Sequence, residues 1–242
     1  MRGSTILILI CMLVGIVILS ALGTWQVKRL IWKEALIEQV NGRISQDPVS
    51  LSELLSESLK KEDHEYLPVT VAGTFDHDGE VYFFTTNKQG AAGWNVHTPL
   101  QLETGRTIIV NRGFVPFELK SPDERLRGQI AGIQSVTGLL RFPLKEKPFG
   151  SLANFPEKRE FYWRNVPEMS AVMTQDQEIE FLPVIIDAGK TENPGGWPRG
   201  DTTIVSFSNN HVQYAVTWYG LALTLLGVGG FFLYSRRQNK DG

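Results

Sequence analysis

The amino-acid sequence predicts an α+β membrane protein, in which two transmembrane helices bracket one β-rich, antiparallel, barrel-like extracytoplasmic domain with short helices. Three observations predict this fold class. A long apolar stretch without formal charge lies near each end of the 242-residue chain. The segment between them is long enough to bury a core of its own. After residue 68, short runs of that segment alternate apolar and polar residues with a period of two, as half-buried strands do.

The first apolar stretch, residues 3–27, is rich in Ile, Leu and Val. A hydrocarbon core about 30 Å thick needs roughly 20 such residues in a helix, so we predict a transmembrane helix over residues 5–27. The alternative is a cleaved signal peptide, with Ala21-Leu22-Gly23 as a small-residue cleavage site. The apolar run exceeds the ~7–15 residues of a usual signal peptide, which favours an uncleaved anchor.

The second apolar stretch, Val212 to Tyr234, is also free of charge. Asn209 and Asn210 precede it and are good helix caps. We therefore predict a second transmembrane helix over residues 209–234, followed by a cytoplasmic tail, residues 235–242.

The basic residues give a mixed indication of orientation. Those at the outer ends of the two helices favour a cytoplasmic location for both tails: Arg2, Arg236, Arg237 and Lys240. Those that follow the first helix argue against it: Lys28, Arg29 and Lys33. Because a long domain crosses a membrane largely regardless of its charge, we expect residues 28–208 to be periplasmic, in a multi-pass protein of the bacterial inner membrane. No Arg- and Ser-rich transit leader is present, which favours this location over the mitochondrial inner membrane, although a mature organellar form would look similar.

Composition excludes several classes of protein. Residues 24–210 carry 20 Lys and Arg against 25 Asp and Glu, a net charge of −5, which is a poor match for a nucleic-acid binder. The single cysteine, Cys11, lies inside the first apolar stretch. An internal disulfide, a cysteine zinc site and a covalently attached haem are therefore excluded.

Between the apolar stretches the sequence predicts helices and then strands. Helical spacing continues over residues 28–40 until Asn41-Gly42 gives an end signal, and Ser50–Leu59 is an amphipathic helix. A helical turn or two begins at Pro167 and reaches Met173. The predicted strands are Val69–Phe75, Glu80–Thr86, Trp94–Leu102, Arg106–Phe114, Gln134–Arg141, Phe161–Asn165 and Phe181–Asp187, with Ile204–Phe207 as a possible eighth. Many short strands with short links favour an antiparallel sheet that curls or closes into a barrel.

The sequence contains none of the common catalytic motifs, so we expect no enzyme and no catalytic residues. Three of the four histidines have ordinary interpretations. His77, between Asp76 and Asp78, belongs to a solvated turn better than to a metal site. His64 lies in a charged surface run, and His97 alternates within a strand as a surface or half-buried residue.

His211 is different, because it begins a membrane helix. One face of that helix carries residues at spacings of three and four: His211, Tyr214, Ala215, Trp218 and Ala222. The two alanines leave a shallow slot that the aromatic rings flank, and neutral imidazole is a common axial ligand of haem iron. The alternative is an interfacial belt, in which these residues only anchor the helix.

The first helix offers a counterpart at the same depth. Trp25, Arg29 and Trp32 share one face, and Gln26 and Lys33 lie beside them. A cation between two indole rings just outside the membrane is suited to carboxylates such as haem propionates. An aromatic belt with snorkelling basic residues is the simpler alternative.

These residues resemble the Surfeit locus protein 1 family, whose members are assembly factors of cytochrome c oxidase. Three blocks carry the resemblance, together with two membrane helices that bracket one outer domain. The blocks are Gly23-Thr24-Trp25-Gln26 with Arg29 and Trp32-Lys33, Val110-Asn111-Arg112-Gly113-Phe114-Val115-Pro116, and Asn210-His211-Val212-Gln213-Tyr214-Ala215-Val216-Thr217-Trp218-Tyr219-Gly220. The third block is the most specific.

The resemblance implies a haem a chaperone that helps to place haem a in oxidase subunit I, with His211 as the iron ligand and Tyr214, Trp218, Arg29 and Trp25 around the cofactor. A partnership with the haem a synthesis machinery is also conceivable, whereas nucleic acid is not expected. The second block is interpreted as structural: Gly113 permits a bulge or a close backbone approach, and Arg112 has a further possible place near the membrane face.

Two other functions stay open at this point. One is a docking scaffold for oxidase assembly that binds only protein. The other is an enzyme that modifies haem within the membrane, but such an enzyme needs intramembrane histidines or acidic residues, and the apolar spans contain none.

Overall fold

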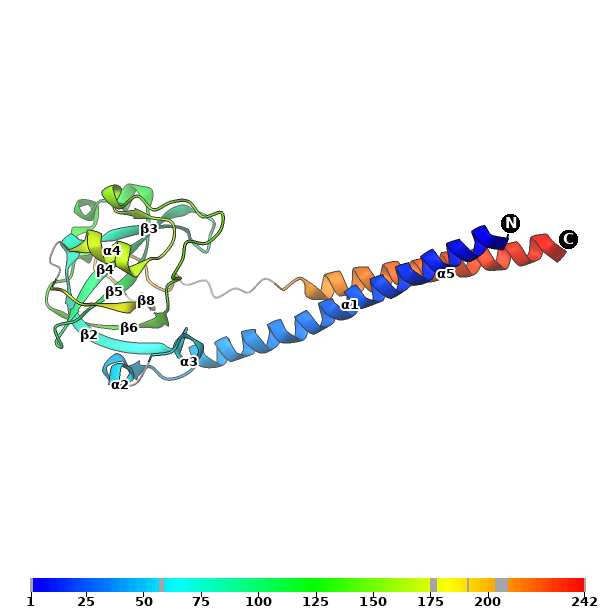
Figure 1. The fold of residues 1–242 in the computed structure, drawn as a ribbon. Helices are drawn as coiled ribbons and strands as arrows, with labels where there is room; N and C mark the ends of the chain where they lie inside the picture. Colours follow the sequence, from blue (N-terminus) through cyan, green and yellow to red (C-terminus); the bar gives the residue numbers. More distant parts are fainter. Residues whose placement is uncertain (1, 57–58, 175–177, 191, 203–208, 242) are drawn as a thin grey trace. The chain divides into compact units, whose positions relative to one another are not determined.

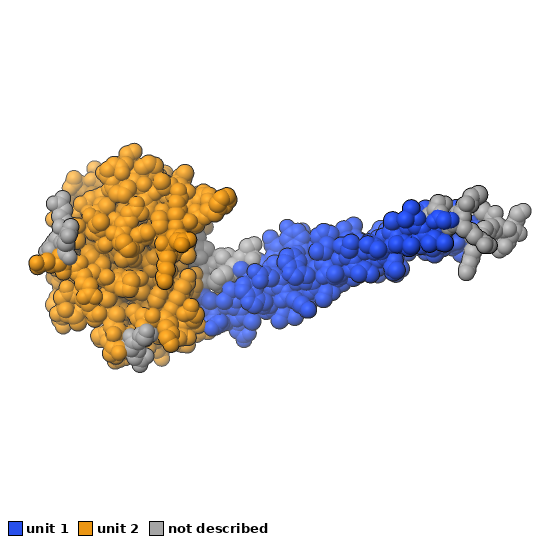
Figure 2. Space-filling view, viewed as in Figure 1, with its two compact units in different colours: residues 1–40, 206–242 blue, residues 41–205 orange. Residues whose placement is uncertain are grey.

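The computed structural model describes residues 2–56, 59–174, 178–190, 192–202 and 209–241 (Figure 1). The chain divides into two compact units: residues 1–40 with 206–242, and residues 41–205 (Figure 2). We call the first the helix pair and the second the barrel domain.

The helix pair consists of α1 (Arg2–Ile44), whose last residues belong to the barrel domain, and α5 (His211–Asp241). Both helices are long and apolar enough to cross a membrane, as the sequence predicted. The helix predicted to end at residue 40 continues to Ile44, because Asn41 keeps helical geometry and its carbonyl accepts a hydrogen bond from the Ser45 amide at 3.1 Å.

The barrel domain contains three short helices, α2 (Leu51–Ser56), α3 (Lys61–His64) and α4 (Val166–Met173). Its strands are β1 (Val49–Ser50), β2 (Pro68–Phe75), β3 (Val81–Thr86), β4 (Ala92–Leu102), β5 (Thr107–Pro116), β6 (Ile133–Arg141), β7 (Glu160–Phe161) and β8 (Phe181–Ala188). Each of the seven predicted strands that falls on described residues has a counterpart here. Ile204–Phe207, the possible eighth, lies outside the described residues.

The strands close into a barrel. The sheet order is β1-β2-β6-β8-β5-β4-β3-β7, and a further pairing of β2 with β4 closes the ring β2-β6-β8-β5-β4. Strand β4 makes this closure possible because its first part pairs with β3, whereas its end, from Leu100 to Leu102, pairs with β2. The pairing is mainly antiparallel, but β1–β2, β3–β7 and β5–β8 are parallel in the described part of the chain.

Two strands differ from the prediction in length or presence. The strand predicted over Phe161–Asn165 ends at Phe161, because the Asn154 side chain accepts hydrogen bonds from the amides of Tyr162 at 2.8 Å and Trp163 at 3.2 Å and draws them away from strand pairing. Strand β1 was not predicted, since two residues carry no readable alternation.

Two apolar clusters lie on opposite faces of the sheet. The interior cluster fills the barrel and includes Val69, Leu100, Ile108, Leu140 and Ile186. The second cluster packs α4 against the outer face: Val81, Ile109, Phe161, Val166, Met169, Met173 and Ile185. This outer face also carries polar residues. His97 of β4 lies on it, because it pairs in register with Val81 of β3 and Asn111 of β5.

Candidate cofactor site

Small residues allow α1 and α5 to approach closely. An added Cβ at Gly15 would lie 2.9 Å from Leu225, one at Gly23 would lie 2.8 Å from the Tyr219 ring, and one at Gly229 would meet Met12. These contacts run in opposite directions along the two helices, so the pair is antiparallel. Close approach at small residues is typical of helix association in membranes, where van der Waals packing replaces the hydrophobic drive.

His211 lies at the head of α5 and contacts α1. Its Nδ1 lies 2.7 Å from Oε1 of Gln26, whose side chain is only 8% exposed. The His211 ring itself is half-buried, and its Nε2 makes no hydrogen bond within the part of the chain that the structure describes. One ring nitrogen is thus held by the partner helix, and the other is open to a ligand.

A second polar contact joins the helices about two turns further along α5. The hydroxyls of Thr24 and Tyr219 lie 2.9 Å apart, and Thr24 also donates to the carbonyl of Ser20 at 2.9 Å. Sequence reasoning did not assign Tyr219 a role. The signal was present, because Gly23-Thr24 and Tyr219 both belong to the blocks that carried the family resemblance.

The slot expected between the aromatic rings is not an opening. Ala215 and Ala222 are buried at 6% and 7% exposure, on the same face of α5 as His211. Because that face contacts α1, the alanines serve close helix packing instead of opening a cavity. A flat ligand of His211 must therefore lie at the margin of the helix contact.

The predicted aromatic residues lie around that margin. On α5, Tyr214 is 54% exposed and Trp218 is half-buried, one and two turns from His211. On α1, Trp25 is 56% exposed and adjoins Gln26 in the chain. Arg29 follows Gln26 by about one helical turn, and its guanidinium stacks 4.1 Å from the centroid of the Trp32 ring, one of the two indoles predicted to flank it.

The other histidines are held within the barrel domain. His97 is fully buried, which corrects its expected surface or half-buried position: it lies on the outer face of the sheet, against which α4 packs, and the Phe83 ring contacts it edge-on. Its Nδ1 lies 3.2 Å from the Asn95 carbonyl oxygen, and its Nε2 has no hydrogen-bond partner among the described residues. Burial, followed by the charge of Arg164, lowers the pKa of His97 to about 3.

His77 is not a freely solvated turn residue. Its Nε2 lies 3.1 Å from the Ile130 carbonyl oxygen, and its Nδ1 lies 3.4 Å from the Arg112 guanidinium. The half-buried His64 bonds within its own turn, where its Nδ1 lies 2.9 Å from the Lys60 carbonyl oxygen. Among the described residues, no group of three or more His, Cys, Asp and Glu side chains is arranged to hold a metal ion.

Two clusters of charged side chains lie in the barrel domain, one centred on Glu80 near His77 and the other centred on Asp187 near His97. Glu80, 2% exposed, pairs with both Arg112 and Arg125. Burial raises the pKa of Glu80, but its bonds to His77 and Arg125 and the two Arg charges lower it further, so the net direction is downward. Asp187 pairs with Arg141 at 2.8 Å and Arg164 at 2.9 Å.

The block around Arg112 has a structural role, as predicted, but Arg112 itself is not a surface residue. It is 4% exposed and donates to the Gly128 carbonyl at 2.5 Å, so its guanidinium is held inside the barrel domain, and its expected place near the membrane face stays a prediction. Burial first, despite the opposing charge of Glu80, lowers its pKa to about 10. Gly113 has φ of +117°, and a Cβ there would lie 1.9 Å from the carbonyl oxygen of Arg199. Only glycine allows that segment to pair with Phe114.

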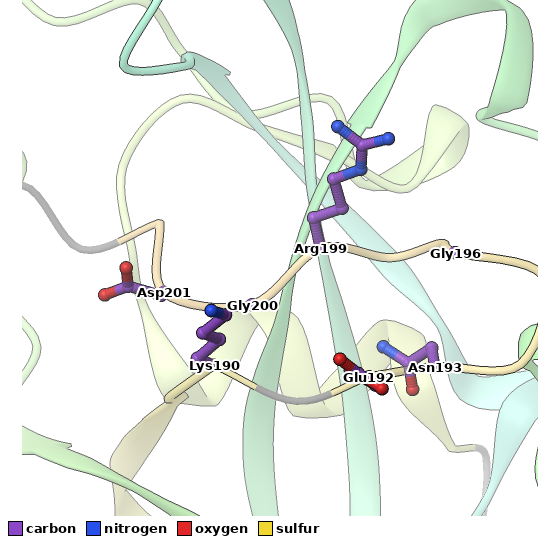
Figure 3. Close-up of a pocket in the computed structure, with 7 residues that line it drawn as sticks. All are labelled: Lys190, Glu192, Asn193, Gly196, Arg199, Gly200 and Asp201. Carbon is purple, nitrogen blue, oxygen red and sulfur yellow. The ribbon is translucent and has the colours of Figure 1, made fainter.

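A surface pocket of about 480 Å³ lies beside this segment (Figure 3). Lys190, Glu192 and Asn193 line one side, and Gly196, Arg199, Gly200 and Asp201 line the other. In Figure 3 the Arg199 side chain points away from the Lys190, Glu192 and Asn193 side of the pocket. Asp201 pairs with Lys88 at 2.9 Å. The acidic and basic residues that line the pocket balance in charge, so the lining selects neither an anion nor a cation.

The fold and the helix contact define a class of protein: a barrel domain joined to a pair of membrane-capable helices that hold a partly exposed histidine. The SURF1 family model matches residues 13–223. The chain is 38% identical to Surfeit locus protein 1 of Gallus gallus over 216 residues, 83% of this chain and 67% of that protein. It is 35% identical to Surfeit locus protein 1 of Homo sapiens over 217 residues, 83% and 69% of the two chains.

A similar match extends beyond the vertebrates. The chain is 33% identical to a SURF1-like protein of Monosiga brevicollis over 238 residues, which cover 93% of this chain and 87% of that protein. The chain therefore belongs to the SURF1 family, which confirms the resemblance found in its three sequence blocks.

Proposed function

We propose that this protein is a cytochrome c oxidase assembly factor that binds haem a transiently and assists its insertion into subunit I of the oxidase. Membership of the SURF1 family, known for cytochrome c oxidase assembly factors, supports the assembly role. In this proposal haem a is cargo, the protein acts as a chaperone without catalysing a reaction, and subunit I is the receiving partner.

The observation that carries the haem proposal is the state of His211. Imidazole binds iron through an unprotonated nitrogen, and His211 has a nitrogen without a hydrogen-bond partner among the described residues, on a half-buried ring. Histidines that bind metals usually donate their other ring N–H to a fixed acceptor. Gln26 provides such an acceptor at 2.7 Å, so the residues present fit the group.

Four further residues are proposed to contact the cargo. Tyr214 and Trp218 flank His211 on α5 and offer exposed aromatic surface to a flat apolar ring. Trp25 offers similar surface on α1. Arg29 supplies a positive charge for propionate carboxylates, since guanidinium groups suit carboxylate geometry. Among the described residues, the Arg29 guanidinium stacks on the Trp32 ring, which leaves its N–H groups able to donate to a carboxylate.

We further propose that the protein lies in a bacterial inner membrane with its barrel domain in the periplasm. The basic residues after α5 support this orientation. A membrane-impermeant thiol reagent added to intact cells should label a cysteine placed at Gln89, an exposed turn residue, in a chain that lacks Cys11. Labelling only after cell lysis would reverse the orientation.

The haem proposal is tested by an absorption spectrum. The full chain is purified in detergent from cells that make haem a, both as wild type and as His211→Ala. Wild type should carry a Soret band, and the variant should lose most of it or show a shifted band, because imidazole is the proposed iron ligand.

His64→Ala is the matched control, since the His64 ring lies in the barrel domain and its Nδ1 bonds to Lys60 in its own turn. His77 is less suitable, because it contacts the buried Arg112 cluster. An unchanged haem content and spectrum in His211→Ala would make His211 an interfacial anchor. Oxidase assembly without any bound haem would instead favour a docking scaffold.

A further inference from the structure

The amide of Gln26 is an unusual group for its place in the chain. It lies in the last part of the charge-free stretch of α1, is 8% exposed, and faces α5. A polar side chain in an apolar helix is costly unless it is paired. The atom of Gln26 that faces the partner helix is Oε1, and its partner is Nδ1 of His211.

This contact determines where the proton of the ring lies. An amide oxygen only accepts hydrogen bonds, so at 2.7 Å from Oε1 the Nδ1 of His211 must donate and carry the hydrogen. In a neutral imidazole the other nitrogen, Nε2, is then unprotonated, with its lone pair exposed. The backbone amide of His211 bonds separately, to Oδ1 of Asn209 at 3.5 Å, and does not constrain the ring.

We infer that Gln26 is a positioning residue that fixes His211 as the Nδ1–H tautomer and presents Nε2 to iron. The inference rests on the proposed haem function for its purpose, but the tautomer itself is a property of the haem-free protein. Second-sphere acceptors of this kind typically contribute about 10–100-fold to metal affinity. Gln26 belongs to α1, so the hydrogen bond that fixes the His211 tautomer on α5 comes from the opposite helix. Movement of α1 relative to α5 would break this hydrogen bond and weaken iron binding by His211.

The tautomer is measured directly by nitrogen NMR. The haem-free full chain, labelled with ¹⁵N-histidine and placed in lipid nanodiscs at pH 8, contains four histidines, and His211→Ala assigns the His211 signals. Wild-type His211 should show a protonated Nδ1 and an unprotonated Nε2. Gln26→Leu, which removes the acceptor but keeps a side chain of similar length, should mix the two tautomers. Gln26→Glu, which restores an acceptor, should restore the Nδ1–H form.

Gln213→Leu is the matched control, because Gln213 is an exposed glutamine on α5, and it should leave the His211 signals unchanged. A wild-type Nε2–H tautomer, or identical His211 signals in wild type and Gln26→Leu, would overturn the inference.

A haem titration separates this inference from the proposed function. Gln26→Leu should weaken haem binding by about 10–100-fold, with Gln26→Glu closer to wild type and Gln213→Leu equal to it. If wild type shows the predicted tautomers but takes up no haem, the proposed function fails while the assignment of the proton by Gln26 stands. If haem binds equally to wild type and Gln26→Leu, the positioning role fails while the haem function stands.

Discussion

The barrel domain and the helix pair both bury polar groups, and a comparison of the two explains which part is suited to chemistry. In the barrel domain, buried charges satisfy one another: Asp187 pairs with Arg141 and Arg164 and accepts from Asn111 at 2.8 Å. In the helix pair, the buried amide of Gln26 meets His211, which retains one nitrogen without a partner among the described residues. Groups that are fully paired stabilise a fold, whereas a half-used imidazole can accept a ligand.

His97 and His211, which each have one ring nitrogen without a partner among the described residues, show the same difference. His97 has no exposed surface, so no ligand reaches its Nε2 unless that region of the barrel domain opens. His211 is half-buried and can be reached from the margin of the helix contact. Exposure therefore separates these two residues: a ligand can reach the open nitrogen of His211 but not that of His97.

The largest effect that the comparison predicts is at Asp187. Asp187→Ala leaves the Arg141 and Arg164 charges without their shared buried partner, and breaking a buried pair in this way typically costs about 3–5 kcal/mol. Urea unfolding of the full chain in detergent, followed by near-ultraviolet circular dichroism, should show a loss of this size. The haem spectrum of molecules that stay folded should not change.

Asp201→Asn provides the control, because Asp201 and Lys88 form an exposed ion pair at 2.9 Å. Such pairs contribute about 0–1 kcal/mol, and asparagine tolerates the positive φ of this position. Equal losses for the two variants would show that burial of the Asp187 cluster has no special energetic role.

Much of the fold was predictable from the sequence because it depends on local patterns. Alternation and turn signals located the strands from β2 to β6 and β8, and apolar length located both helices. The short β1 and β7 were not predictable in extent. Their limits depend on contacts between distant parts of the chain, such as the capture of the Tyr162 amide by the Asn154 side chain.

The candidate site was predictable in composition but not in geometry. Helical periodicity placed His211 and the alanines on one face, but it could not show that α1 covers that face and closes the slot. Likewise, alternation placed His97 on a face of β4 without showing that α4 covers it. The pairing of Gln26 with His211 depends on the register of two antiparallel helices, which each helix alone does not specify.

The second prediction concerns pH and sharpens the contrast between the two histidines. Burial lowers the folded-state pKa of His97 to about 3, whereas an unfolded histidine titrates near 6.5. Below about pH 6.5 the unfolded chain binds a proton that the folded barrel does not bind. Stability from this residue is therefore complete above pH 6.5 and falls toward pH 3, by about 1.4 kcal/mol per pH unit.

Urea unfolding at pH 7, 6 and 5 measures this slope. At pH 5 wild type should have lost about 2 kcal/mol relative to pH 7 through His97, and His97→Gln should remove that part of the slope. His64→Gln should keep it, because His64 is half-exposed. Asp187 does not contribute to the slope between pH 5 and pH 7. Burial raises its pKa, but the charges of Arg164 and Arg141 lower it by more, so its folded-state pKa lies below the ordinary value. The stability that Asp187 contributes is therefore lost only at lower pH. A wild-type slope equal to that of His97→Gln would refute the assignment.

The smallest effect is expected at the hydroxyl pair within the helix pair. Thr24→Val keeps the shape of the side chain but removes the contact with Tyr219 at 2.9 Å and the bond to the Ser20 carbonyl. Interhelical hydrogen bonds in membranes average about 0.6 kcal/mol, because the separated helices also find partners. We therefore expect a small loss of helix association, far below the loss at Asp187.

Thr217→Val isolates the interhelical part of that loss, because the Thr217 hydroxyl donates at 2.8 Å to the Gln213 carbonyl within its own helix. Energy transfer between dyes on Cys11 and on a cysteine introduced at Gly230, where an added side chain meets no neighbour within 4 Å, reports helix separation as sodium dodecyl sulfate is added. The difference between the two valine variants should be about 0.6 kcal/mol. A difference of several kcal/mol would break the comparison, because the helix pair would then depend on its polar contacts as strongly as the barrel does. No difference would mean that the small-residue packing at Gly15, Gly23 and Gly229 holds the helices, leaving the polar residues at their head free to serve the ligand.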